Sequence, residues 1–154
     1  MTRKATNNDI PAIAELYREQ FREMAKLIPD FIKEGDQSTE FIENTIANEE
    51  SDILIYENDD MIVGFILLQA KTRPDFPFML PGKYCYIMDI IVTENHRGKG
   101  FGTALMNAAK DWAKEHNCLA DFRYTEEAHS LDDMMDAIKD VQWDLMRLKD
   151  LKWK

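Results

Sequence analysis

The stretch IVTENHRGKGFGTAL, residues 91–105, decides how the chain is interpreted, because it contains three of the six glycines in the sequence. Gly98, Gly100 and Gly102 follow an apolar run and precede a helix-like pattern that begins near Thr103. Glycines let backbone N–H groups approach a ligand closely, and the start of a helix attracts anions. A flexible turn needs one glycine rather than three. The spacing therefore predicts an anion-binding loop between a strand and a helix.

The elements around this loop follow from hydrophobic periodicity and from turn residues. Residues 7–24 carry apolar side chains at helical spacing, and residues 52–59 and 61–71 are strand-like runs joined by a polar turn. The run YCYIMDIIVT, residues 84–93, is apolar enough for a central strand that is covered on both faces. The remaining predicted elements are strands at 2–6 and 118–124, and helices at 38–47, 103–116 and from Leu131 onward.

The order of these elements is β-α-α-β-β-β-α-β-α, which predicts an α/β (α+β) fold with a mixed, mostly antiparallel sheet flanked by helices. A parallel crossover is expected around the helix that follows the glycines. The chain has 154 residues, the size of one domain, so residues 1–154 are expected to form a single domain.

Three phosphate-loop patterns can be compared with the glycine stretch. A Walker loop requires G-x-x-x-x-G-K-[ST], which does not occur here, and a dinucleotide fingerprint requires a third glycine where this chain has Thr103. The segment Arg97-Gly98-Lys99-Gly100-Phe101-Gly102 instead has the form R-x-x-G-x-G. In its position between a strand and a helix, this segment resembles the acetyl-CoA motif of the GCN5-related N-acetyltransferase (GNAT) family.

The resemblance covers about residues 2–118. It includes RKATNNDIPAIAELY as an opening strand and helix, and IYENDDMIVGFILLQ as a central hairpin. It implies that acetyl-CoA is the co-substrate and that main-chain groups of Ile90, Ile91 and Val92 bind the pantetheine arm. The residues that the resemblance places around the pyrophosphate are Arg97, Gly98, Lys99, Gly100, Phe101, Gly102 and Thr103.

The chemistry that the resemblance implies is direct attack of an amine on the thioester, without an acetyl-enzyme. An alkyl ammonium has a pKa of about 10.4, so a base must accept its proton near neutral pH. Asp89, a carboxylate within an apolar strand, is the best candidate base, because burial raises the pKa of a carboxyl group. The alternative is a carboxylate that backbone N–H groups or a lysine satisfy. Glu94 is the second candidate.

Two departures from the family pattern affect the catalytic residues. Many relatives have a glutamate where this chain has Met88, and no residue after Tyr124 matches the asparagine and tyrosine that relatives often place on a helix. Tyr124 is the nearby phenol and is the candidate general acid for the leaving thiolate. A partly buried strand aromatic is the alternative interpretation of the same residue.

Composition excludes several other classes of function. The net charge of −10 argues against nonspecific nucleic-acid binding, and no apolar run approaches the roughly 20 residues that a membrane helix needs. The N-terminus lacks the apolar core of a signal peptide, so a cytoplasmic protein is expected. Cys85, Cys118 and the three histidines have no metal-ligand spacing, so no metal site is expected.

The C-terminal region, residues 119–154, departs from the family as an atypical strand followed by a long helix. Met134, Ile138, Val141, Leu145 and Leu148 form one apolar stripe. The stripe is expected to pack on the chain's own core, or else to pair two copies as a homodimer.

The sequence as a whole therefore predicts an acetyl-CoA-dependent N-acetyltransferase that acts on a small-molecule or peptide amine. A noncatalytic acyl-CoA-binding or interaction module on the same fold is the alternative. The negative charge of the chain favours a basic acceptor only weakly.

Overall fold

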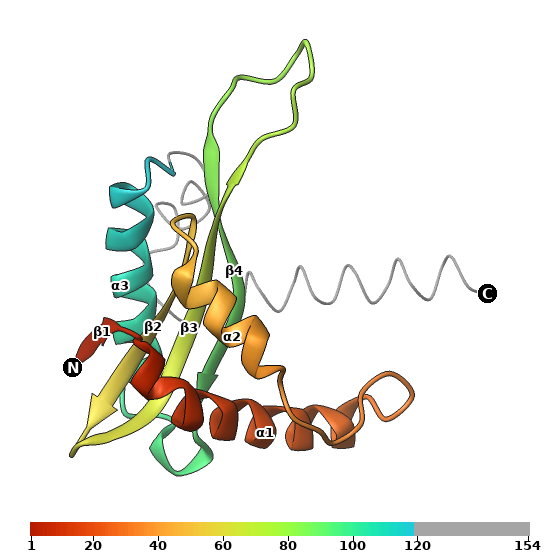
Figure 1. The fold of residues 1–154 in the computed structure, drawn as a ribbon, viewed down its shortest axis with the longest axis vertical. Helices are drawn as coiled ribbons and strands as arrows, with labels where there is room; N and C mark the ends of the chain where they lie inside the picture. The colour runs from red at the N-terminus through yellow and green to blue at the C-terminus, as the bar shows by residue number, and fades with distance from the viewer. Residues whose placement is uncertain (119–154) are drawn as a thin grey trace. The chain divides into compact units, whose positions relative to one another are not determined.

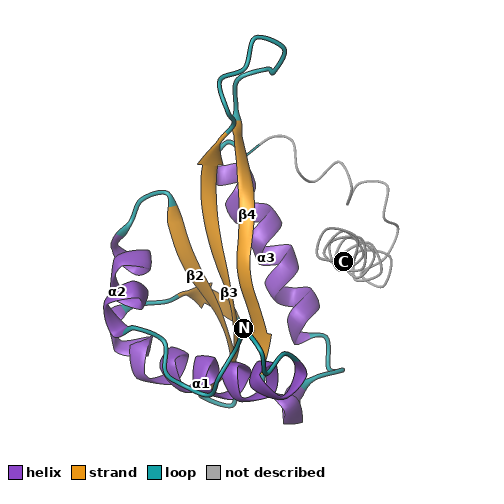
Figure 2. Cartoon of the chain, turned by 90° about the vertical axis from the view of Figure 1, so that its right-hand side faces the viewer, coloured by secondary structure: helices purple, strands orange, loops and turns teal. Residues whose placement is uncertain are grey.

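Residues 1–118 are described by the structure, a computed structural model, and they form a four-stranded sheet with helices on both of its faces (Figures 1 and 2). The predicted order of elements is confirmed over these residues. The elements are β1 (Thr2–Lys4), the 3-10 turn η1 (Asn7–Asp9), α1 (Ile10–Leu27), α2 (Thr39–Ala47), β2 (Ser51–Asn58), β3 (Met61–Thr72), β4 (Lys83–Val92), η2 (Glu94–His96) and α3 (Phe101–Glu115).

The sheet has the strand order β1-β2-β3-β4, and each strand is antiparallel to its neighbour. The hairpin predicted at 52–71 is present, and its two-residue turn places Asp59 at φ 49° and Asp60 at φ 61°. Two positive φ angles are typical of the tight turn that matches the twist of a hairpin, and aspartate tolerates them better than most residues. The polar turn in the sequence therefore corresponds to this hairpin.

The two faces of the sheet bury different helices. Odd-numbered residues of the central strands, such as Ile55 and Phe65, join the core beneath α1, whereas Ile66 and Leu68 are completely buried on the opposite face. Helix α3 packs on β2, β3 and β4 from that second face (Figure 2). Successive side chains of a strand point to opposite faces, and both faces of β3 are covered by helices. Nearly every residue in the middle of β3 is therefore apolar.

Strand β4 differs from the prediction in one respect. The expectation that both of its faces are covered is wrong for the described residues, because Tyr86, Met88 and Ile90 are 44%, 41% and 42% exposed. In the register with β3, Leu67 pairs with Asp89 and Leu68 pairs with Ile87, so Met88 is an extra residue in a β-bulge. Since β4 is the last of the four described strands, its bulge lies on an outer edge of the described sheet.

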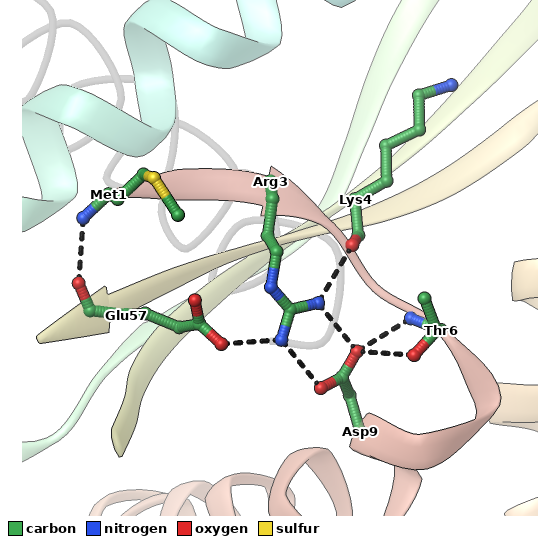
Figure 3. Close-up of polar contacts among 6 residues, drawn as sticks. All are labelled: Met1, Arg3, Lys4, Thr6, Asp9 and Glu57. Atoms are coloured by element: carbon green, nitrogen blue, oxygen red, sulfur yellow. Dashed lines mark hydrogen bonds and ion pairs between the residues drawn. The ribbon is translucent and has the colours of Figure 1, made fainter. Parts of the chain in front are cut away.

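An ionic network fixes the start of α1 against the sheet (Figure 3). The Arg3 guanidinium donates to both oxygens of Asp9, at 2.8 and 2.9 Å, and to Glu57 on β2, at 2.5 Å. The backbone N–H and the hydroxyl of Thr6 also donate to Asp9. The hydrogen bonds from Arg3 are the main reason that the pKa of Asp9 lies well below its ordinary value.

The remaining predictions concern the end of the described chain. Cys118 forms an isolated parallel bridge with Lys83, which agrees with the expected parallel crossover around α3. Four predictions lie outside the described residues, namely the rest of the strand 118–124, the role of Tyr124, the helix from Leu131 and the homodimer through that helix. Over residues 1–118, the helices are all too short or too polar to cross a membrane.

Candidate acetyl-donor site

The connection from β4 to α3 has the backbone conformation that its glycines predict. Gly98 has φ +74° and Gly100, the N-cap of α3, has φ +85°, a region that residues with a side chain rarely adopt. A Cβ atom added at either position would meet no protein atom within 4 Å. The glycines are therefore required by the backbone conformation, and the space beside them is open to a ligand.

The start of α3 faces this open space without a side-chain cap. The first N–H groups of a helix have no intrahelical acceptor, and the helix dipole adds about half a positive charge there. Phe101 fixes the first turn, because its ring stacks on Tyr56 of β2 with the centroids 4.4 Å apart. Gly102 lies in the same turn, and an added Cβ there would be 3.9 Å from Val92, an ordinary contact. The N–H groups near Thr103 are thus held in place by packing of the helix on the sheet.

The two cations of the loop have different surroundings. Arg97 Nε donates to the backbone carbonyl of Val92 at 2.8 Å, and Arg97 Nη2 donates to both oxygens of Glu23 at 2.9 and 2.8 Å. Lys99 is exposed, and no carboxylate within residues 1–118 forms an ion pair with it. Among the described residues, Lys99 is therefore the cation of the loop whose charge no carboxylate neutralises, whereas Arg97 is paired with Glu23.

The end of β4 borders a cavity of about 280 Å³ that lies against the C-terminal half of α1. Ile91 points into the core beneath α1 and is only 5% exposed, whereas the side chain of Ile90 is 42% exposed. Gln20 also lines the cavity. Its buried Oε1 atom has no hydrogen-bond partner among the described residues. A buried acceptor without a donor is unusual. The other lining residues are Glu19, Glu23, Met24, Leu27, Val92 and Arg97.

Asp89 is half-buried beside the bulge and accepts a hydrogen bond from Tyr17 of α1, at 2.8 Å from Tyr17 Oη to Asp89 Oδ2. Tyr17 is completely buried, and burial together with the neighbouring Asp89 carboxylate raises the pKa of its phenol. The phenol therefore stays protonated and orients the carboxylate. Glu94, the second candidate base, is exposed, and its backbone N–H donates to Glu19 at 3.1 Å.

Three residues that hydrogen-bond to the predicted segment were not themselves predicted from the sequence: Tyr17, Glu19 and Glu23. All three lie on α1, where Tyr17 is part of the apolar stripe and the glutamates belong to the polar side. Their partners lie 72 to 75 residues further along the chain. The spacing of Tyr17 and the glutamates along one helix was visible, but no local signal indicated which distant segment they contact.

The predicted site residues are thus found in three places. Ile90, Ile91 and Val92 end β4, the segment from Arg97 to Thr103 forms the loop and the start of α3, and Asp89 lies just before them on the strand. Over residues 1–118, no group of three or more His, Cys, Asp or Glu side chains could hold a metal ion. The arrangement suits a ligand with an anionic group at the loop and an extended part along the strand.

Sequence relatives of this chain are named as acetyltransferases. The acetyltransferase (GNAT) family model matches residues 10–131. The uncharacterized N-acetyltransferase YhfO of Bacillus subtilis (strain 168) is 32% identical over 114 residues, which are 74% of this chain and 70% of that protein. Streptothricin acetyltransferase A of the same organism is 35% identical over 75 residues, covering 40% of this chain and 42% of that protein.

Solved structures share the fold. A mutant of the BH1408 protein from Bacillus halodurans has a TM-score of 0.72 at 23% identity, covering 83% of this chain and 87% of that chain. The acetyltransferase from Vibrio fischeri has a TM-score of 0.65 at 19% identity, covering 77% and 89% of the two chains. The family match over most of the chain, together with the relationship to YhfO, shows that this protein belongs to the GNAT family of acetyltransferases.

Proposed function

We propose that this acetyltransferase uses acetyl-CoA and transfers the acetyl group to a primary amine by direct attack within a ternary complex. The observation that carries the proposal is the β4–α3 loop, where two glycines with positive φ leave open space beside an uncapped helix start. Backbone N–H groups in such a loop bind phosphate oxygens, and the helix dipole favours the negative charge. The CoA pyrophosphate supplies that charge.

The described residues fit a bound acetyl-CoA in two further ways. The cavity along Ile90, Ile91 and Val92 has room for part of the pantetheine arm. In this proposal, main-chain groups at the end of β4, an edge of the described sheet, hydrogen-bond the extended ligand, as in the addition of a strand to a sheet edge. When bound, acetyl-CoA supplies a thioester carbonyl as the acetyl donor.

In this proposal Asp89 is the general base. Its Oδ2 atom is held by the Tyr17 hydroxyl, so its second oxygen remains to accept a proton from the incoming ammonium, directly or through a water. We assign the stabilisation of negative charge on the carbonyl oxygen to a backbone N–H at the end of β4. Tyr124 remains our proposal for the acid that protonates the thiolate.

The acceptor is proposed to be a small-molecule or peptide amine. One relative is named for acetylation of streptothricin, which supports a small-molecule acceptor, and the net charge of −10 favours a basic one. A cytoplasmic location remains a prediction.

The test is release of free CoA from acetyl-CoA in the presence of a panel of polyamines, amino sugars and peptides. Acetylated product confirmed by mass spectrometry is the expected result. Tight binding of CoA without turnover on any acceptor would instead favour a noncatalytic acyl-CoA-binding module.

A further inference from the structure

Two glutamates of α1 hold the segment that leads from β4 into the glycine loop. Glu19 accepts the backbone N–H of Glu94 at 3.1 Å, and Glu23 accepts two hydrogen bonds from the Arg97 guanidinium. Residues four apart lie on the same side of a helix, so both carboxylates reach the same segment. The conformation of the loop is therefore tied to the C-terminal half of α1.

Arg97 completes this connection on the side of the strand. Its Nε donates to the Val92 carbonyl at 2.8 Å, which closes the turn between the last residue of β4 and the loop. Its Nη2 is 2.8 and 2.9 Å from the two Glu23 oxygens, so the positive charge is neutralised within the protein. A guanidinium with these partners orders the backbone but offers little net charge to a phosphate.

The surroundings of the ion pair indicate a local role. The side chains of Arg97 and Glu23 are 48% and 37% exposed, and ion pairs this exposed contribute little to the stability of a protein. The pair nevertheless connects three separate elements, namely α1, the end of β4 and the segment before Gly98. Loss of the pair is therefore expected to make the loop less ordered, with little effect on the free energy of global unfolding.

We propose that Glu23 is a positioning residue for acetyl-CoA binding, acting through Arg97 to hold the backbone N–H groups of residues 98–103 in place. This inference rests on the proposed function of the loop. It separates the two cations of the motif, since Arg97 arranges the backbone while Lys99 supplies the free charge near the phosphates.

The opposite assignment, in which Arg97 contacts the phosphates directly, makes a different prediction. Glu23 would then compete with the ligand for the guanidinium, so Glu23→Gln would strengthen acetyl-CoA binding or leave it unchanged, while Arg97→Gln would weaken it. If Glu23 positions the loop, both substitutions weaken binding, and Arg97→Gln weakens it at least as much as Glu23→Gln because it also removes the hydrogen bond to Val92. The sign of the Glu23→Gln effect therefore decides between the two assignments.

The experiment compares wild type, Glu23→Gln, Arg97→Gln, the double variant and Glu15→Gln in the full chain. Glu15 is a matched control, because it lies on the same helix and pairs with Arg18 rather than with the loop. Calorimetric titration measures the affinity for acetyl-CoA, and steady-state assays with a working acceptor measure kcat and KM. Hydrogen exchange without ligand measures how well ordered residues 98–103 are.

The expected result is a Kd for acetyl-CoA raised about fivefold in Glu23→Gln and at least as much in Arg97→Gln, with the double variant no weaker than Arg97→Gln and kcat little changed. Amides of residues 98–103 should exchange faster in these variants and not in Glu15→Gln. If the amides of residues 98–103 exchange at the wild-type rate in Glu23→Gln, or if Glu23→Gln binds acetyl-CoA as tightly as wild type or more tightly, the inference is overturned. Failure of the wild type to bind acetyl-CoA would overturn the proposed function, whereas the exchange result would still test the positioning role.

Discussion

The substitution Gly100→Ala tests whether the loop backbone contacts the ligand. Gly100 has φ +85°, and an added Cβ would meet no protein atom within 4 Å, so the cost to the free protein comes from the backbone conformation alone. A left-handed conformation costs a residue with a side chain about 1–2 kcal/mol. For a chain of this size, that cost lowers the Tm by roughly 3–6 °C.

The effect of Gly100→Ala on binding should be larger than this strain implies. A hydrogen bond to a charged group contributes about 1.5–3 kcal/mol, so losing one phosphate contact raises the Kd for acetyl-CoA by about 10- to 100-fold. The Tm is measured by calorimetry and the Kd by titration. Gly35→Ala is the matched control, because Gly35 also has open space but does not have a positive φ.

A second variant separates strain from obstruction. Asparagine tolerates the left-handed region better than alanine, so Gly100→Asn should retain more stability and still weaken binding. If Gly100→Ala lowers the Tm as expected but binds acetyl-CoA within about twofold of wild type, the loop does not contact the ligand through this backbone.

Three further predictions concern other parts of the protein. Asp9→Asn should lower the free energy of unfolding by about 1–3 kcal/mol near pH 7. Because the hydrogen bonds from Arg3 hold the pKa of Asp9 below its ordinary value, this stability is fully present above about pH 4 and is lost as the pH falls toward the folded-state pKa. Urea unfolding at several pH values measures the free energy of unfolding. If wild type and Asp9→Asn lose the same free energy of unfolding on acidification, the prediction is contradicted. Asp89→Asn should lower kcat by about 100-fold or more without changing the Kd for acetyl-CoA, and undiminished thiol release would show that Asp89 is not the base. Lys99→Gln should weaken acetyl-CoA binding about threefold and reduce the dependence of the Kd on salt. Titrations at two ionic strengths measure that dependence. If the Kd of Lys99→Gln changes with salt as much as the Kd of wild type, Lys99 does not supply charge to the phosphates.

Local sequence signals predicted most of the described fold. The Asn58–Asp60 turn and the glycines before α3 each require a particular backbone conformation, and the structure has that conformation at both places. The predicted helix start near Ser38 is confirmed, and the structure adds that Ser38 is the N-cap, which accepts the N–H of Phe41 at 3.3 Å. These features depend on neighbouring residues alone, which is why the sequence was sufficient for them.

Features that depend on distant partners were not predictable in the same way. The apolar run of β4 suggested burial on both faces, but hydrophobicity does not indicate which strand lies beside an edge, and Met88 at the bulge is exposed. Tyr17 is part of an ordinary apolar stripe, and its bond to Asp89 spans 72 residues. The ion pair of Glu23 with Arg97 spans 74 residues. Only the folded chain brings these groups together.

The central claim is that the β4–α3 loop binds the pyrophosphate of acetyl-CoA. A crystal structure of the protein with acetyl-CoA tests it most directly. The predicted result is a pyrophosphate whose oxygens lie about 3 Å from backbone nitrogens of residues 98–103, with the pantetheine arm along Ile90 to Val92. A pyrophosphate bound elsewhere, with this loop empty, would contradict the claim.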